Sequence, residues 1–168
     1  MLIASKYEEI YAPEVRDFVY ITDRAYTKEE ILKMEYSMLC ALDFNVTSPS
    51  AYRFLERFAK VAGADSVHFD LARYLIELPL IEYRMLKYPP SIMAASALYL
   101  AHKIRESKGN AWNETLQRHT GYNESSMRPC AKDMCILLQG IEKCSLQAVR
   151  KKFSMPKFNQ VAQIRIMQ

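Results

Sequence analysis

The 168-residue sequence contains only 4 glycines and has no long uncharged apolar run. So little glycine makes a glycine-rich phosphate-binding loop unexpected. The longest uncharged run, Tyr88 to His102 with histidine taken as neutral, contains two prolines and is shorter than the roughly 18 to 20 residues that cross a bilayer. Charged residues follow Met1–Ala4 at once, which is not typical of a secretory signal. We therefore expect an intracellular protein without a membrane segment.

Metal-binding and catalytic patterns are also missing. The four cysteines, at positions 40, 130, 135 and 144, include no CxxC pair, and the three histidines lie in separate segments without HExxH spacing. We expect reduced, buried thiols, no metal site and no cofactor. Because the sequence offers no nucleophile and base constellation and no phosphate loop, we do not expect an enzyme.

Charge is distributed unevenly along the chain. Residues 1–47 carry five Lys and Arg against nine Asp and Glu, whereas the whole chain has a net charge of +4. The two parts are therefore expected to meet different partners. The basic residues of the second part are dispersed apart from Arg150, Lys151 and Lys152, and they lack the dense arrays that bind nucleic acid phosphates. We expect no nucleic acid partner.

The distribution of apolar residues predicts an all-α protein, because no segment alternates with period two. Pro13 is placed at a first helical position, Thr27 and Glu30 form a capping-box pattern, and Gly63 closes a helix. The predicted helices are PEVRDFVYI, TKEEILKMEYSMLCAL, AYRFLERFAKVA, DLARYLIEL, SIMAASALYLAHKI, AWNETLQRHTG and NESSMRPCAKDMCILL.

An internal repeat is visible at an offset of about 96 residues. Tyr26-Thr27 then falls on Tyr122-Asn123, and Met38 falls on Met134. About 50 residues precede the repeated part in the second copy, whereas the first copy begins at Met1 with the last turns of a helix. We expect the first copy to lack its first two helices and part of the third.

Two charged residues interrupt apolar helix faces. Glu35 lies near the centre of an arc formed by Ile31, Leu32, Met38, Leu39 and Leu42, and Lys6 lies among Leu2, Ile3 and Tyr7. A charge on an apolar face costs several kcal/mol unless it is paired. Either the two residues meet each other, or they share polar groups of a partner, or both reach solvent. At an offset of 96, Glu35 maps onto Ala131, so the helical unit itself does not require the charge.

At these residues the sequence resembles a known family. The run LIASKYEEIYAPEVRDFVYITDRAYTKEEILKMEYSMLCALDFNV resembles the second part of the cyclin box of mitotic A- and B-type cyclins. The runs ELPLIEYRMLKYPPSIMAASALYLA and WNETLQRHTGY are similar to their carboxy-terminal cyclin fold, and the Pro-Pro-Ser at 89–91 favours the B type. The resemblance implies tandem cyclin folds: a truncated amino-terminal box over 1–47, a five-helix fold over 48–140 and a carboxy-terminal extension over 141–168.

The resemblance also implies a partner and a site. A mitotic cyclin is a non-catalytic subunit that binds and activates a cyclin-dependent protein kinase in G2/M control, and we expect it in nucleus and cytoplasm. The residues that match Lys6 and Glu35 hydrogen-bond the kinase backbone beside its C helix. The others pack on that helix (Tyr7, Leu39, Phe44 and Val46) or lie beside the activation loop (Glu8, Glu9 and Ile10).

The sequence departs from the family at its amino end, where no MRAIL-like substrate-docking segment is present. This departure leaves open the alternative that the chain is a truncated cyclin that no longer activates a kinase. A cyclin-fold protein of the transcription-factor type, which binds DNA, is a further alternative that the basic second part allows. The acidic first part and the Lys6 and Glu35 arrangement argue against DNA binding.

Overall fold

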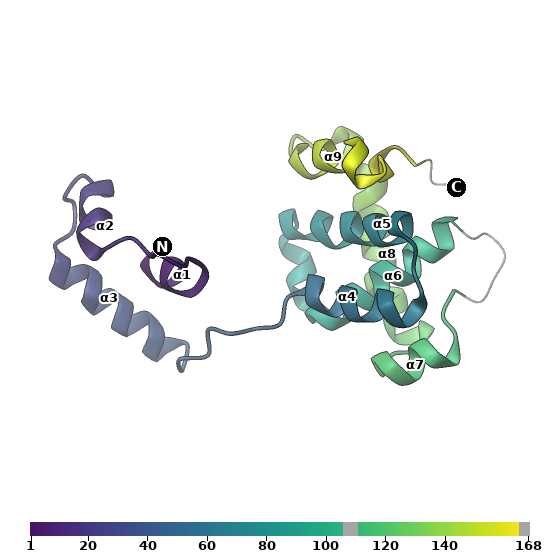
Figure 1. The fold of residues 1–168 in the computed structure, drawn as a ribbon, viewed down its shortest axis with the longest axis horizontal. Coiled ribbons are helices and arrows are strands. Elements are labelled where there is room, and N and C mark those ends of the chain that lie inside the picture. Colours follow the sequence, from purple (N-terminus) through teal and green to yellow (C-terminus); the bar gives the residue numbers. More distant parts are fainter. Residues whose placement is uncertain (106–110, 165–168) are drawn as a thin grey trace. The chain divides into compact units, whose positions relative to one another are not determined.

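The computed structural model describes residues 1–105 and 111–164, and the chain divides into two compact units, 1–48 and 49–168 (Figure 1). In the described part every regular element is helical. The elements are the α-helices α1 (Leu2–Glu8), α2 (Val15–Ile21), α3 (Lys28–Ala41), α4 (Ala51–Ala62), α5 (Ser66–Glu77), α6 (Pro90–Arg105), α7 (Glu114–Thr120), α8 (Glu124–Gly140) and α9 (Ala148–Phe153), and the short 3-10 helices Leu78–Ile81, Tyr83–Lys87, Ile141–Lys143, Pro156–Phe158 and Val161–Gln163. The all-α prediction is confirmed for these residues.

In the first unit, local hydrogen bonds explain where the helices begin. The Thr27 side chain accepts from the Glu30 amide, and the Glu30 side chain accepts from the Thr27 amide, as the capping-box pattern predicts. The prediction that Pro13 is the first helical residue is wrong. Glu14 caps α2 instead, because its amide donates to Asp17 Oδ2 at 2.7 Å and its side chain receives the Asp17 amide. Pro13 therefore precedes the cap.

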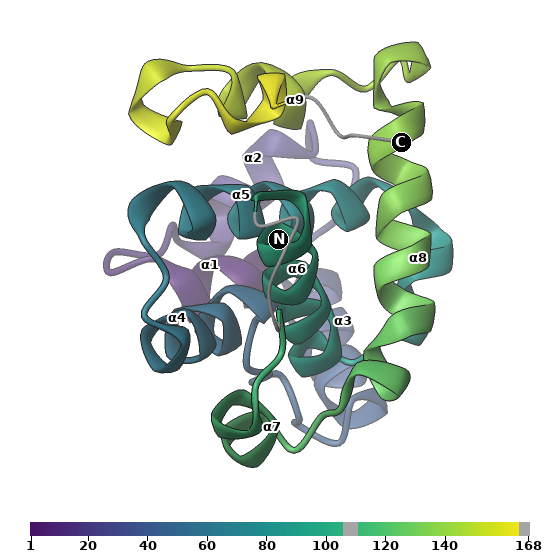
Figure 2. The same cartoon turned by 90° about the vertical axis from the view of Figure 1, so that its right-hand side faces the viewer.

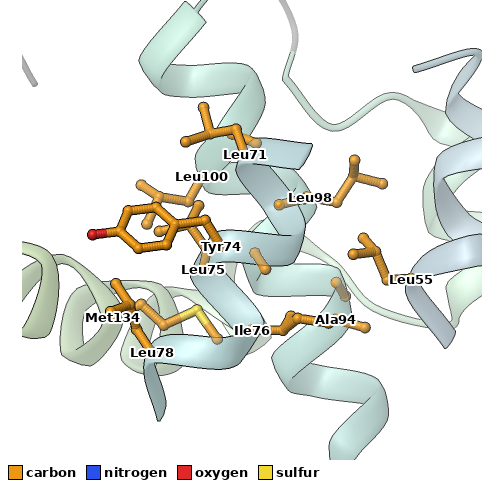
Figure 3. Close-up of a cluster of buried hydrophobic side chains, with 14 of the residues drawn as sticks. Leu55, Leu71, Tyr74, Leu75, Ile76, Leu78, Ala94, Leu98, Leu100 and Met134 are labelled. Atoms are coloured by element: carbon orange, nitrogen blue, oxygen red, sulfur yellow. The ribbon is translucent and has the colours of Figure 1, made fainter. Parts of the chain in front are cut away.

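The second unit is built around α6, which packs against α4, α5 and α8. Four alanines of α6, at positions 94, 95, 97 and 101, are fully buried, and their small side chains allow the neighbouring helices to approach closely. Leucines from α4, α5 and α6 belong to the same cluster of buried side chains (Figure 3). The buried leucines at the centre are Leu55, Leu71, Leu75 and Leu98. Five α-helices, α4 to α8, lie between positions 49 and 140, as predicted for the second fold.

Helix ends in this unit follow their local chemistry, with one difference from the sequence-based prediction. Gly63 ends α4 with φ of 64°, and Gly121 ends α7 with φ of 75°, a conformation that glycine adopts without strain. Helix α5 begins at Ser66 and not at Asp70, because the Asp65 side chain accepts from the His68 amide at 2.7 Å. The predicted start of this helix is therefore one turn too late.

The segment after α8 packs on the same core, and α9 with the 3-10 helices that follow lies against α5 (Figure 2). Phe153 and Val161 are fully buried and Phe158 is 9% exposed. The prediction that this segment packs along the fold is confirmed, although its last four residues, 165–168, lie outside the described part. Two polar contacts join it to α5: Lys152 Nζ donates to Glu77 at 2.7 Å, and Asn159 Nδ2 donates to Asp70 at 2.7 Å.

The repeat is reproduced in the element order, since α1, α2 and α3 correspond to the end of α6, to α7 and to α8. Helices α2 and α7 each have seven residues, and the N-caps of α3 and α8, Thr27 and Asn123, are 96 positions apart. The expectation of buried thiols is confirmed for Cys130 and wrong for Cys40, which is exposed on the polar side of α3, while Cys135 and Cys144 are half-buried. No helix in the described ranges is long and apolar enough to span a membrane.

Candidate functional site

Lys6 and Glu35 meet, although 29 positions separate them in the chain. Lys6 lies in the last turn of α1, and Glu35 lies in the middle of α3. The Lys6 ammonium donates to Glu35 Oε1 at 2.8 Å and to Oε2 at 3.0 Å. The Glu35 side chain is only 14% exposed, whereas that of Lys6 is 52% exposed. Of the alternatives open from the sequence, the structure shows direct pairing of the two residues.

The carboxyl end of α3, the helix that carries Glu35, forms a tight turn. Leu39 lies one helical turn after Glu35 on the same face and is half-buried. The Phe44 amide donates to the Leu39 carbonyl at 2.8 Å, and Phe44 has a left-handed backbone with φ of 54°. This conformation costs an aromatic residue about 1 kcal/mol or more. The turn nevertheless leaves the Phe44 side chain 60% exposed.

Apolar residues on α1 and after the end of α3, the two helices that carry the ion pair, are exposed in this unit. Tyr7 is 51% exposed, and Val46 is 38% exposed. Leu42 is also 50% exposed. It was not among the residues predicted to face the kinase, although its position on the apolar arc of α3 could have added it to them. Exposed apolar groups on the same elements as a charged hydrogen-bonding pair are typical of a protein-protein interface.

The segment that leaves α1 carries the remaining predicted residues. Glu8 is the last residue of α1, Glu9 is extended with φ of −95° and ψ of 137°, and Ile10 is 92% exposed. The structure therefore brings Lys6 into contact with Glu35 and Phe44 into contact with Leu39. Tyr7 and Glu8 lie in α1, Glu9 and Ile10 follow it, and Val46 follows α3, and all five are exposed.

The second unit has a different pair of residues at the positions that correspond to Lys6 and Glu35. Lys103 corresponds to Lys6, and its ammonium lies 5.6 Å from the centre of the Tyr99 ring. Ala131 corresponds to Glu35 and is 6% exposed within the second unit. The ion pair is therefore a feature of the first unit alone within this repeat.

The second unit contains another candidate functional site, a polar cavity of about 350 Å³. The residues that line it include Asp65, His68, His102 and Asn113. Asp65 already receives the His68 amide and the Arg105 guanidinium, at 2.7 and 2.8 Å. These two donors, the amide first, hold the pKa of Asp65 well below its ordinary value. The Asp65 carboxylate of this cavity thus caps α5, and the Asn113 side chain caps α7. In the ranges 1–105 and 111–164 no group of three or more His, Cys, Asp or Glu could hold a metal ion.

Comparisons with known proteins identify both units. Residues 49–166 match the family model of the cyclin C-terminal domain, and residues 1–47 match that of the cyclin N-terminal domain. The chain is 45% identical over 164 residues to a G2/mitotic-specific cyclin-B of Marthasterias glacialis, covering 98% of this chain and 42% of that protein. It is 39% identical over 168 residues to a G2/mitotic-specific cyclin-B of Dictyostelium discoideum, covering 100% and 38%.

An A-type relative is also similar. Cyclin-A1-1 of Oryza sativa subsp. japonica is 44% identical over 167 residues, which cover 96% of this chain and 33% of that protein. The chain thus spans between 33% and 42% of the length of these three relatives. The mitotic A- and B-type resemblance noted in the sequence is confirmed. With two tandem helical units that match its N- and C-terminal domains, the chain belongs to the cyclin family.

Proposed function

We propose that this chain is a non-catalytic regulatory subunit that binds and activates a cyclin-dependent protein kinase in G2/M control. The observation that carries the proposal is the Lys6–Glu35 ion pair among exposed apolar side chains of the first unit. The relatives named above as G2/mitotic-specific cyclins support the same role in the cell cycle.

The ion pair can recognise a peptide backbone. A lysine ammonium has three donors, and two of them are directed at Glu35, so a third can reach a carbonyl oxygen of the kinase. The Glu35 carboxylate keeps lone pairs for a backbone N–H. Because each residue holds the other in position, both groups are oriented before the partner arrives, and less conformational entropy is lost on binding.

Apolar contacts supply most of the proposed affinity. Tyr7, Leu39, Phe44 and Val46 would cover the kinase C helix, and aromatic residues at the centre of an interface commonly carry much of its binding energy. Glu8, Glu9 and Ile10 would lie beside the activation loop. Docking then shifts the population of the kinase toward the state in which its C-helix glutamate pairs with the lysine that positions ATP. The kinase performs phosphoryl transfer with its own residues.

The test is binding and activation with purified components. Titration calorimetry of the chain against a cyclin-dependent kinase is expected to show a one-to-one complex, and kinase activity with Mg-ATP is expected to rise on addition of the chain. Binding without activation would identify a cyclin that no longer activates. Retention on duplex DNA without kinase binding would favour the transcription-factor alternative, and absence of kinase binding would refute the proposal.

The proposed location is nucleus and cytoplasm, where a cell-cycle kinase and its substrates are found. Fluorescence microscopy of the tagged protein in dividing cells tests it. Signal confined to a membrane compartment would contradict the proposal.

A further inference from the structure

Tyr11 is unusually accessible. Its side chain is 92% exposed, and so is that of Ile10 before it. Four other tyrosines of the first unit are exposed: Tyr7, Tyr20 and Tyr36 lie within helices α1, α2 and α3, and Tyr26, just before the N-cap of α3, is less exposed, at 58%. Tyr11 instead lies between α1 and α2, where residues 9–14 belong to no helix. An enzyme can therefore reach its hydroxyl without unfolding a helix.

The backbone around Tyr11 is suited to a substrate groove. Glu9 has φ of −95° and ψ of 137°, and Glu14 has φ of −75° and ψ of 158°, so the segment is extended at both ends. Pro13 has no amide donor and keeps Ala12 away from helical conformation. Ile10 and Tyr11 lie in a bend between these extended ends, and because no hydrogen-bonded helix holds them, the segment can straighten into the extended form that the substrate groove of a protein kinase accommodates.

The residues before Tyr11 define the class of enzyme. Glu8 and Glu9 are three and two positions before it, and Ile10 immediately precedes it. Two adjacent carboxylates complement a basic substrate groove, and an exposed isoleucine complements an apolar pocket. Tyr83 offers a contrast: it is 84% exposed, but it lies in a 3-10 helix, and its one preceding acid, Glu82, is bound to Arg84 at 3.0 Å.

We propose that Tyr11 is a phosphorylation site for a protein tyrosine kinase that selects acidic substrates. In the reaction Tyr11 Oη attacks the γ-phosphorus of ATP, a P–Oη bond forms, and the bond from that phosphorus to the β–γ bridging oxygen breaks. The hydroxyl proton passes to the carboxylate base of the tyrosine kinase, and ADP leaves with magnesium. Both the ATP and the catalytic base come from that enzyme.

Phosphorylation changes the electrostatics of the proposed docking segment, and this second step rests on the proposed function. The phosphate adds about −1.5 to −2 charges at neutral pH next to Glu8, Glu9 and Glu14. Ile10 and the two glutamates are the residues expected to lie beside the activation loop. A doubly charged group at that edge must lose water and face like charges, so modification of Tyr11 weakens docking of the cyclin-dependent kinase.

The first experiment tests the site without the docking partner. The purified 168-residue chain is incubated with Mg-ATP and a tyrosine kinase catalytic domain of acidic substrate preference, and phosphopeptides are mapped by mass spectrometry. Label is expected at Tyr11, and the joint substitution Glu8→Gln with Glu9→Gln is expected to lower kcat/KM about tenfold. Tyr83→Phe is the matched control and should leave the rate unchanged. Label on Tyr83 in place of Tyr11, or a rate insensitive to both glutamates, overturns the assignment.

The second experiment compares the unmodified chain and the Tyr11-phosphorylated chain in binding to a cyclin-dependent kinase. The phosphorylated form is expected to bind about tenfold more weakly or worse. Equal or tighter binding overturns the regulatory step. If the unmodified chain does not bind at all, the proposed function fails, while the assignment of Tyr11 as the modified residue is still decided by the first experiment.

Discussion

The ammonium of Lys6 lies within 3.0 Å of both carboxylate oxygens of Glu35, and this pair joins α1 to α3 in the first unit. The pair is unequally exposed, with Glu35 mostly covered and Lys6 half open to solvent. Water screens the open side, so the pair contributes about 1 kcal/mol or less to folding. A partner that covers it would remove this screening, and its hydrogen bonds would then be worth more.

The pair predicts a selective loss of kinase affinity. Lys6→Ala or Glu35→Ala is expected to weaken binding by about 2 to 5 kcal/mol, because each leaves the other charge unpaired in the covered interface. Lys33→Ala and Lys103→Ala are the controls and should change affinity by about 1 kcal/mol or less. Lys33 is exposed on the opposite side of α3, and Lys103 is the repeat partner of Lys6.

An exchange variant separates folding from recognition. Lys6→Glu combined with Glu35→Lys keeps an ion pair within the unit but reverses the donor and the acceptor offered to the kinase backbone. We expect thermal unfolding close to that of the parent and affinity as low as in the single variants. Affinity restored by the exchange, or unchanged in all single variants, would show that the pair acts only within the fold. Calorimetry and thermal unfolding are recorded on the same samples.

We predict that Phe44 contributes to kinase binding although its left-handed backbone conformation destabilises the first unit. Phe44→Gly relieves a left-handed conformation at φ of 54° and should leave the first unit equally or slightly more stable, by up to about 1 kcal/mol. Loss of the exposed ring should weaken kinase binding about tenfold or more. Asp43→Gly is the matched control, because Asp43 has φ of 50° and loses no aromatic ring. Equal affinities of the two variants would remove Phe44 from the site.

Phe153 is predicted to hold the carboxy-terminal segment on the second unit. It is fully buried, 5.4 Å from the Tyr74 ring and 4.9 Å from the Phe158 ring between centroids. Phe153→Ala should destabilise the unit by about 3 to 5 kcal/mol and expose the basic residues around it to trypsin. Fluorescence of Trp112, which is the one tryptophan of the chain and is buried, follows the unfolding.

The exposed Lys151 gives the control, since Lys151→Ala should change stability by no more than about 0.5 kcal/mol. Cleavage of the parent after Lys152 or Lys157 as fast as in Phe153→Ala would mean that the segment is not held by this ring.

Asp65 predicts how the second unit responds to acid. Its pKa is lowered in the folded state, so below about pH 4 the unfolded chain binds the proton more readily and stability falls as pH falls. Above its pKa in the unfolded chain, Asp65 makes its complete contribution to the stability of the second unit. The side chain is 54% exposed, which keeps the effect to about 1 kcal/mol or less. Urea midpoints from Trp112 fluorescence between pH 2.5 and 7 measure it.

Asp65→Asn is the informative variant, because asparagine also caps helices but carries no charge. Its urea midpoint should depend less on pH below 4 than that of the parent, whereas Asp65→Ala should cost about 1 kcal/mol more at neutral pH through loss of the cap. Parallel pH profiles for parent and Asp65→Asn would place the acid response elsewhere.

The amino-acid sequence determined the features that depend on neighbours a few positions apart. Thr27 and Glu30 bond each other's amides across three positions, and Gly63 supplies the left-handed residue that ends α4. Such bonds close within one turn, so residue types suffice to predict them. Prediction from residue types failed at α2, where the N-cap is a residue type that seldom caps helices. Glu14 and Asp17 form a capping box that a search for serine or threonine does not find, and the start of α2 was therefore misplaced.

Only the tertiary structure decided which contacts form between residues that are far apart in the sequence. The sequence predicted that Lys6 and Glu35 need partners, but pairing, sharing a partner and reaching solvent all satisfied that need until α1 and α3 were placed together. Likewise, Arg73 lies between 5.2 and 5.9 Å from the ring centres of Tyr52, Phe69, Phe153 and Phe158. These rings come from α4, α5 and the carboxy-terminal segment, and no local pattern connects them. Packing of the whole chain selects such contacts, because the free energy of burying one face depends on every helix that covers it.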